Sequence, residues 1–289
     1  METKRALRMV WTVALVCGIA MVAMAADTPK TAPAATDSSQ AKPAENSATE
    51  LAKKSQNPIS DLVTLSFQNN TYFQTGPDGK TQNVLLVQPV LPFSMNEDWN
   101  FIARPIIPII NQPAMTDSQN RNGGLGNIQL QTFFSPKKPV NGWILGFGPY
   151  FEFPTNSGPD GQFGTDNWSA GPAFVALQIK GPWVYGGLAT HLWSCYGNDP
   201  QTNLTSVQPF INYNMAEGWY LSASPTITAN WAADASDTWT IPLGGGIGKV
   251  FKIGKQHINA ALRVYHNIES PRGGADTQIQ FQLNFLFPK

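Results

Sequence analysis

The chain has 289 residues and carries little charge: Lys, Arg, Asp and Glu make up 13% of it, against about 25% in ordinary soluble proteins. Basic and acidic residues number 19 each, so the formal net charge is 0, which excludes the basic balance of a nucleic-acid-binding protein. Hydrophobic residues are only 42%, so neutral polar residues replace the missing charge. This composition favours strands with one wet and one apolar face.

The first 25 residues have the three parts of a secretory signal peptide. Lys4, Arg5 and Arg8 form the positive end, residues 9–22 form the apolar run, and residues 23–25 form a small-residue cleavage site. Cleavage removes three basic residues and one acidic residue, which leaves a formal charge of −2. It also leaves Cys195 as the single cysteine, so no internal disulfide is expected.

Residues 26–58 form a second segment, rich in Ala, Pro, Ser, Thr and Lys. The segment has too few apolar residues to bury, so we expect a disordered periplasmic tether, with one or two helical turns over residues 48–54. The composition changes abruptly at Ile59. We therefore expect the folded domain to cover residues 59–289.

From Ile59 onward the chain consists of strand-length segments, many with apolar and polar residues in alternation. In residues 277–287 five apolar residues alternate with Gln and Asn, which puts the apolar set on one face of a strand. The connections are long and short in turn, as in outer-membrane barrels, and a sheet in lipid must close on itself. Twelve such segments are predicted: residues 60–74, 81–93, 99–111, 125–135, 143–154, 166–179, 183–196, 204–214, 219–231, 237–250, 256–268 and 277–287.

Tryptophans stand at both ends of these segments. Indole settles at the headgroup level of a membrane, so two belts indicate a barrel that spans a bilayer. The belt beside the short turns is Trp99, Trp143, Trp183 and Trp219, and the belt beside the long loops is Trp168, Trp193, Trp231 and Trp239. We predict an all-β fold, an antiparallel transmembrane β-barrel of about twelve strands in a Gram-negative outer membrane. With an even strand count, both termini lie in the periplasm.

Eight prolines fall in the interior of the predicted strands, away from the strand ends. Proline cannot donate to a strand ladder and usually marks an edge or a bulge. Their similar distance from the short turns predicts a band of bulges around the wall rather than eight wrong strands. The prolines are Pro89, Pro105, Pro108, Pro149, Pro172, Pro209, Pro225 and Pro242.

Several short blocks, in order along residues 50–289, resemble one bacterial family. They include GPWVYG at residues 181–186, QPFINYN at 208–214, PLGGG at 242–246 and the ending FLFPK at 285–289, with others at 50–54, 57–58, 66–70, 87–90, 99–100 and 218–221. The family is that of the transporter-like proteins of the phenol-degradation meta pathway, whose members are also labelled neuromedin U. The resemblance implies an outer-membrane barrel linked to the uptake of aromatic compounds.

Charged and amide residues inside the strands are the candidates for the lumen. A Lys or Arg facing lipid at the midplane costs about 2–4 kcal/mol, so we expect these side chains to line a pore or to pair across it. A mostly neutral polar wall suits uncharged solutes better than strong ion selectivity. The candidates are Arg104, Glu152, Lys249, Arg263, Gln129, Gln131, Gln278, Gln280, Gln282 and Asn284.

Enzymatic and metal sites are weakly indicated. An esterase on the lipid side of the wall needs a hydroxyl beside a histidine that a third group orients. The histidines are His191, His257 and His266. Ser194 is too near His191 along one strand and faces the other way, and no serine is evident beside His257. No Cys or His pair has metal-ligand spacing. We therefore expect no catalytic residue, no metal and no cofactor.

The sequence leaves three functions open. A passive channel for small neutral or aromatic solutes leads, because the inner face is rich in amides and because Phe133 and Tyr265 are candidates to point inward. A plugged structural or interaction barrel comes second, because the glycines at 244–246 leave room for a plug; an outer-membrane esterase comes third. The expected partners are outer-membrane lipid, the barrel-assembly machinery and a small solute, and no nucleic acid.

Overall fold

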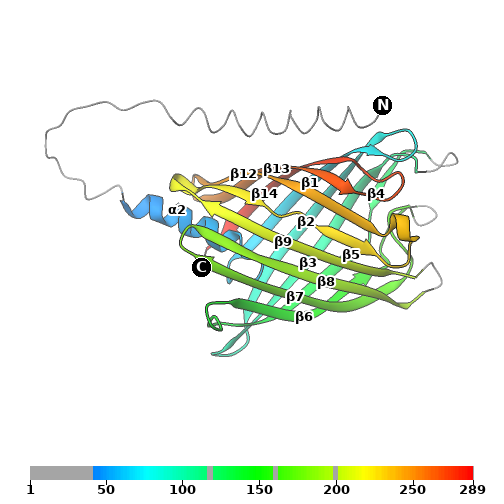
Figure 1. The fold of residues 1–289 in the computed structure, drawn as a ribbon. Helices are drawn as coiled ribbons and strands as arrows, with labels where there is room; N and C mark the ends of the chain where they lie inside the picture. The colour runs from blue at the N-terminus through cyan, green and yellow to red at the C-terminus, as the bar shows by residue number, and fades with distance from the viewer. Residues whose placement is uncertain (1–41, 116–119, 159–161, 198–200, 289) are drawn as a thin grey trace, which may run out of the picture. The chain divides into compact units, whose positions relative to one another are not determined.

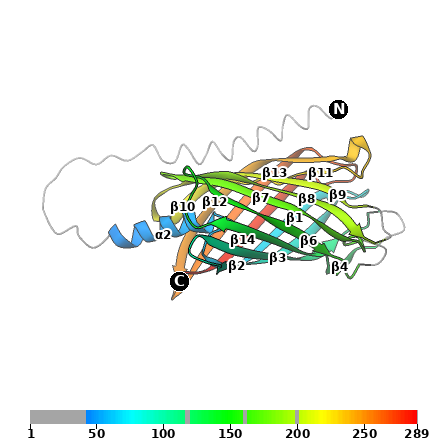
Figure 2. The same cartoon turned by 90° about the horizontal axis from the view of Figure 1, so that it is seen from below.

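Antiparallel strands surround the interior of this protein (Figure 1; Figure 2). The computed structural model describes residues 42–115, 120–158, 162–197 and 201–288; the expected signal peptide lies outside them. One helix, α2 (Lys42–Ser55), precedes the strands in this part of the chain. The strands are β1 (Val63–Thr75), β2 (Lys80–Ser94), β3 (Trp99–Gln112), β4 (Asn122–Leu125), β5 (Ile128–Pro136), β6 (Ile144–Phe153), β7 (Trp168–Lys180), β8 (Trp183–Tyr196), β9 (Asn203–Asn214), β10 (Trp219–Ala223), β11 (Ile227–Asn230), β12 (Trp239–Ile253), β13 (Gln256–Glu269) and β14 (Thr277–Phe287).

The sheet is closed, which leaves no strand edge for lipid to meet. Within the described residues, fourteen strands fill twelve wall positions, because β4 and β5 both pair with β3, and β10 and β11 both lie between β9 and β12. The seam joins β1 to β14, from Val63 opposite Phe287 to Phe73 opposite Thr277. The predicted fold class, an antiparallel barrel of about twelve strands, is confirmed.

Short turns gather at one end of the barrel and long loops at the other. Gly181 and Gly254 begin the two-residue turns after β7 and β12, with φ of 58° and 59°. Hairpin turns of this length need such left-handed angles, which glycine adopts without strain.

At the long-loop end, Arg272 donates from Nη2 to Oδ2 of Asp237 at 2.6 Å, and this bond lowers the pKa of the Asp237 carboxyl.

The outer surface is apolar between two sets of tryptophans. Trp143, Trp183 and Trp219 stand at the short-turn end, and Trp168 opens β7 at the other end. Of the eight predicted belt residues, all but the half-buried Trp99 are exposed, at 38–50%. Phenylalanines and branched aliphatic side chains are exposed between them, among them Phe174 and Phe281. A surface of this kind needs an apolar surrounding.

Each of these eight interior prolines lies at or beside an irregularity of the wall. Pro89 and Pro105 fall where the β2–β3 pairing stops between Val87 and Leu91. The other irregularities are the gap in β5–β6 at Pro149, the gap in β7–β8 at Pro172, the break between β10 and β11 at Pro225 opposite Pro209, the register shift at Pro242, and the β4–β5 break beside Pro108. The expected band of bulges is thus mainly a band of missing strand pairs, because proline has no backbone N–H to donate to the neighbouring strand.

The segment before β1 differs from its prediction. Residues 42–55 are helical, so the helical turns expected over residues 48–54 are confirmed. Leu51, Ala52 and Ile59 pack inside the barrel, so the interpretation as a disordered tether is wrong for residues 48–58. Figure 1 shows α2 at the same end of the barrel as the end of β14. No helix in the described ranges is long and apolar enough to cross a membrane. Residues 26–41 lie outside the described residues.

Candidate functional site

The interior of the barrel has an apolar half and a polar half. In the apolar half, inward side chains of β3 and β5–β9 form one buried cluster around Phe133, Leu177 and Val184. In the polar half, the inward positions of β1 are Thr64, Ser66, Gln68 and Asn70, and those of β14 are amides. Hydrogen-bonding side chains and apolar side chains thus face each other across one lumen.

Residues 51–62 enter this lumen and contact both halves. Leu51, Ala52 and Leu62 are buried against inward residues of β10, β12, β13 and β14, and Ala52 has no exposed surface. Ile59 joins the apolar cluster of the opposite wall. We call residues 51–62 the plug segment.

Polar bonds hold the plug segment to the wall at the short-turn end. The side chains of Gln56 and Asn214 exchange two hydrogen bonds, of 2.9 and 3.1 Å. The amide of Asn259 donates to Oγ of Ser55 at 2.9 Å and accepts from the hydroxyl of Tyr220 at 2.7 Å. The segment is therefore fixed by matched partners and not only by apolar contact.

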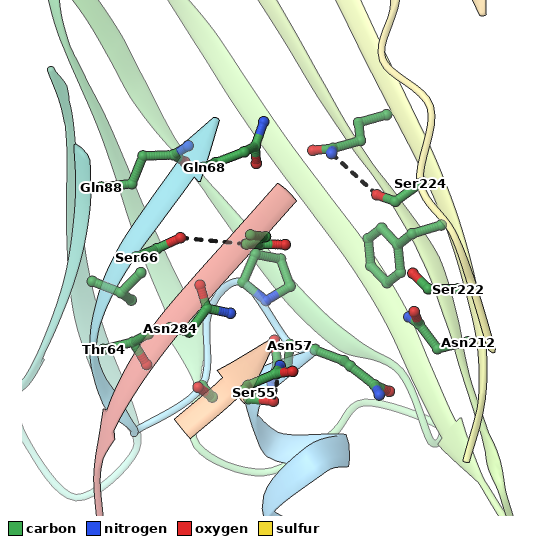
Figure 3. A pocket seen from close by; sticks show the side chains of 18 of the residues that line it. Ser55, Asn57, Thr64, Ser66, Gln68, Gln88, Asn212, Ser222, Ser224 and Asn284 are labelled. Carbon is green, nitrogen blue, oxygen red and sulfur yellow. Dashed lines mark hydrogen bonds between the residues drawn. The ribbon is translucent and has the colours of Figure 1, made fainter. Parts of the chain in front are cut away.

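A cavity of about 130 Å³ lies above the plug segment (Figure 3). Ser55 and Asn57 line its lower part, Ser66, Gln88 and Asn284 lie on one side, and Asn212, Ser222 and Ser224 lie on the other. We call it the lumen pocket. It is the candidate functional site, because it lies inside a closed wall and gathers inward polar groups from both sides of the lumen.

Two arginines line the lumen pocket from opposite ends of a five-strand arc, β3-β2-β1-β14-β13. Arg104 donates from Nη2 to Oε1 of Gln88 at 2.5 Å and from Nη1 to Gln131 at 3.4 Å. Arg263, which is only 7% exposed, donates to Ser222, Gln280 and Gln282 at 2.9–3.0 Å. Both cations are thus held by neutral groups.

Nine of the ten lumen candidates lie on the inner wall. Arg104, Arg263, Gln280, Gln282 and Asn284 line the lumen pocket itself. Gln278 bonds to the buried Asn70 outside the pocket. Gln131 accepts the bond from Arg104. Gln129 and Glu152 form a second network with Tyr150 and Asn127, in which Gln129 donates to Glu152 at 2.7 Å.

Lys249 is the exception, and its predicted place in the lumen is wrong. The next residue, Val250, faces inward against the plug segment, so alternation puts Lys249 on the outer face. Its Nζ lies 4.6 Å from the ring centroid of Trp219, the first residue of β10. The cation thus stacks on an indole of the short-turn belt, so no lumen is needed to shelter it.

Sequence reasoning missed the lower part of the pocket and part of its sides. The alternation of Thr64, Ser66 and Gln68 with apolar residues gave the same period-two signal as β14 and was available. The contribution of the plug segment had a weaker signal, namely the apolar residues Leu51, Ile59 and Leu62 in a polar stretch. Phe133 and Tyr265, named as inward candidates, are both buried, at 0% and 2% exposure.

The histidines show one pair that the sequence did not predict. His191, which alternates with inward Leu192, contacts Oγ1 of Thr205 through Nδ1 at 2.7 Å. Nε2 of His191 is buried without a hydrogen-bond partner. Ser194 instead accepts a bond from the backbone N–H of Thr202. Among the described residues, no cluster of three or more His, Cys, Asp or Glu side chains is placed to hold a metal.

Comparison with solved structures finds outer-membrane barrels. The COG4313 outer membrane channel from Pseudomonas putida F1 is similar with a TM-score of 0.60 and 14% identity, over 78% of this chain and 94% of that one. This likeness shows the fold. Outer membrane phospholipase A from Escherichia coli (TM-score 0.44, 12% identity, 79% and 99% covered) and a FadL homologue from Pseudomonas aeruginosa (0.35, 13%, 80% and 91%) also match, at scores too low to carry an argument.

No protein-family model matches the chain, and no curated protein sequence does. The resemblance of the sequence blocks to the phenol-degradation transporter-like proteins therefore stays a prediction.

Proposed function

We propose that this protein is an outer-membrane channel through which small neutral or aromatic solutes pass by way of the lumen pocket. The observation that carries the proposal is a polar pocket inside a closed barrel whose outer face is apolar. Hydrogen-bonding groups inside such a wall give a solute a path with partners along it. The fold supports this function because solved outer-membrane barrels, a channel among them, share it.

The experiment is planar-bilayer conductance of the refolded protein, with Arg104→Ala and Glu152→Ala beside the wild type. Wild type is expected to give discrete current steps. Removing the cation at Arg104 should lower the preference for anions, and removing the carboxylate of Glu152 should raise it. These opposite shifts in reversal potential serve as mutual controls. The absence of current from all three proteins, together with unchanged solute uptake in a deletion strain, contradicts the channel.

A plugged structural barrel is the second candidate, favoured by the buried contacts of the plug segment. A barrel held shut by the plug segment would give no current until that segment is displaced. A channel would conduct while the segment stays in place, or would open and close as the segment moves. An esterase has only the His191–Thr205 contact in its support. It needs a third group to orient the imidazole, and Nε2 of His191 has no partner in the described part of the chain.

A further inference from the structure

The lumen pocket carries positive charge without an acidic partner. Arg104 and Arg263 line it, and no described lining residue is Asp or Glu. Neither arginine takes part in an ion pair with a described residue. Glu152, on the inner wall of β6, is bound by Asn127 and Gln129 and is not part of the lining.

A buried cation held by neutral groups is costly, and an anion in contact with it offsets that cost. Guanidinium has five N–H donors arranged to fit a carboxylate. Arg263 donates to described residues from Nε and Nη1. Its Nη2 donates to no described residue. Arg104 likewise has no acceptor for Nε among the described side chains. Both side chains thus keep donors for a ligand.

The same pocket has an apolar side. Val90, Leu188 and Phe210 line it and belong to, or pack on, the apolar cluster of the opposite wall. A ligand that fills the pocket therefore meets N–H donors on one side and hydrocarbon on the other. Its volume of about 130 Å³ is near the roughly 150 Å³ of an apolar cavity that holds benzene. A single ring or a short branched chain fits this space.

We propose that the lumen pocket binds a small organic carboxylate with an apolar body, its carboxylate on Arg263 and Arg104 and its apolar part against Leu188 and Phe210. This inference rests on the proposed function and narrows it, because it names an anionic solute where the amide-rich wall alone suggests a neutral one. The pocket then selects on charge and on apolar volume together.

The test is equilibrium binding of benzoate to the refolded full chain in detergent, measured by calorimetry or saturation-transfer NMR. Benzyl alcohol keeps the ring without the charge, and acetate keeps the charge without the ring. Benzoate is expected to bind about ten-fold or more tightly than either, because benzyl alcohol lacks the charge-assisted bond to the arginines and acetate lacks the ring that packs against Leu188 and Phe210. Arg263→Gln and Arg104→Gln should each weaken benzoate by a similar factor, and Arg263→Lys should weaken it less.

Lys249→Gln is the matched control, because it removes one cation from the outer face and should leave benzoate binding unchanged. Equal binding of benzyl alcohol and benzoate, or no benzoate binding by wild type, overturns the inference. So does unchanged binding by a folded Arg104→Gln protein, which stands in if Arg263→Gln does not refold. Benzoate binding without bilayer current, together with unchanged solute uptake in a deletion strain, would instead refute the channel and leave the anion site standing.

Discussion

Tyr220 crosses the neighbouring strand at a position that has no side chain. It faces Gly248 in the β10–β12 pairing and passes over it to donate to Asn259, with 1% of its surface exposed. A Cβ at Gly248 would lie 2.2 Å from Cζ of the tyrosine. The glycine thus makes room for the contact that ties β10, β13 and the plug segment together.

Gly248→Ala is therefore expected to displace Tyr220, break its bond to Asn259 and lower the free energy of unfolding by about 1–3 kcal/mol. The measurement is the denaturant midpoint of the barrel in detergent micelles. Gly187→Ala on β8 is the control, because the nearest atom to its added Cβ is 3.8 Å away and its midpoint should stay unchanged. Equal midpoints for the two variants would refute this role of Gly248.

At the scale of the element, α2 and the residues after it are the part of the chain whose packing the sequence did not predict. Period two in β1 and β14 identifies inward polar side chains because the wall repeats one rule along every strand. The plug segment follows no such rule, since its few apolar residues are buried by a surface formed only when the barrel closes. The prediction for Lys249 is wrong for a related reason. Its ammonium group stacks on Trp219 of another strand, a contact that the local sequence does not reveal.

Ala52→Asp should release the plug segment. The substitution places a carboxylate at a position with no exposed surface, among Tyr220, Val250 and Leu286, and an unpaired buried charge costs several kcal/mol. The strand pairings do not involve α2, so the barrel should remain closed while its single-channel conductance increases. Bilayer recordings measure the conductance, and heat-dependent gel migration measures the barrel.

Glu50→Gln serves as the control on the same helix. Its side chain is 65% exposed and pairs with Lys53 at 2.7 Å, a contact that contributes little at a surface. Its conductance should equal that of wild type. An Ala52→Asp barrel that keeps wild-type conductance would show that the plug segment does not limit the path.

At the scale of the whole molecule, the two ends of the barrel differ in their connections, and this difference predicts its orientation. Outer-membrane barrels have their short turns in the periplasm and their long loops outside the cell. We expect the protein to partition with outer membranes and to migrate differently on gels before and after boiling. Protease added to intact cells should cut within residues 111–124 or 154–165. Cleavage confined to residues 135–142 would invert the orientation, and recovery as a soluble periplasmic monomer would refute the membrane location.

The missing strand pairs are unevenly distributed around the wall, so the stiffness of the barrel differs from one part of the wall to another. The β1–β14 seam pairs without interruption from Val63 to Phe73, whereas β2–β3, β5–β6, β7–β8 and the strands around Pro225 each lose pairs in their middle. Each lost backbone bond removes resistance to shear between two strands. Pairing is also unbroken over β12–β13 from Pro242 to Ile253 and over β13–β14, so neighbouring unbroken pairs run together from β12 to β1. The cylinder is thus stiffest over these strands, and a change in its cross-section is absorbed first at the interrupted pairs.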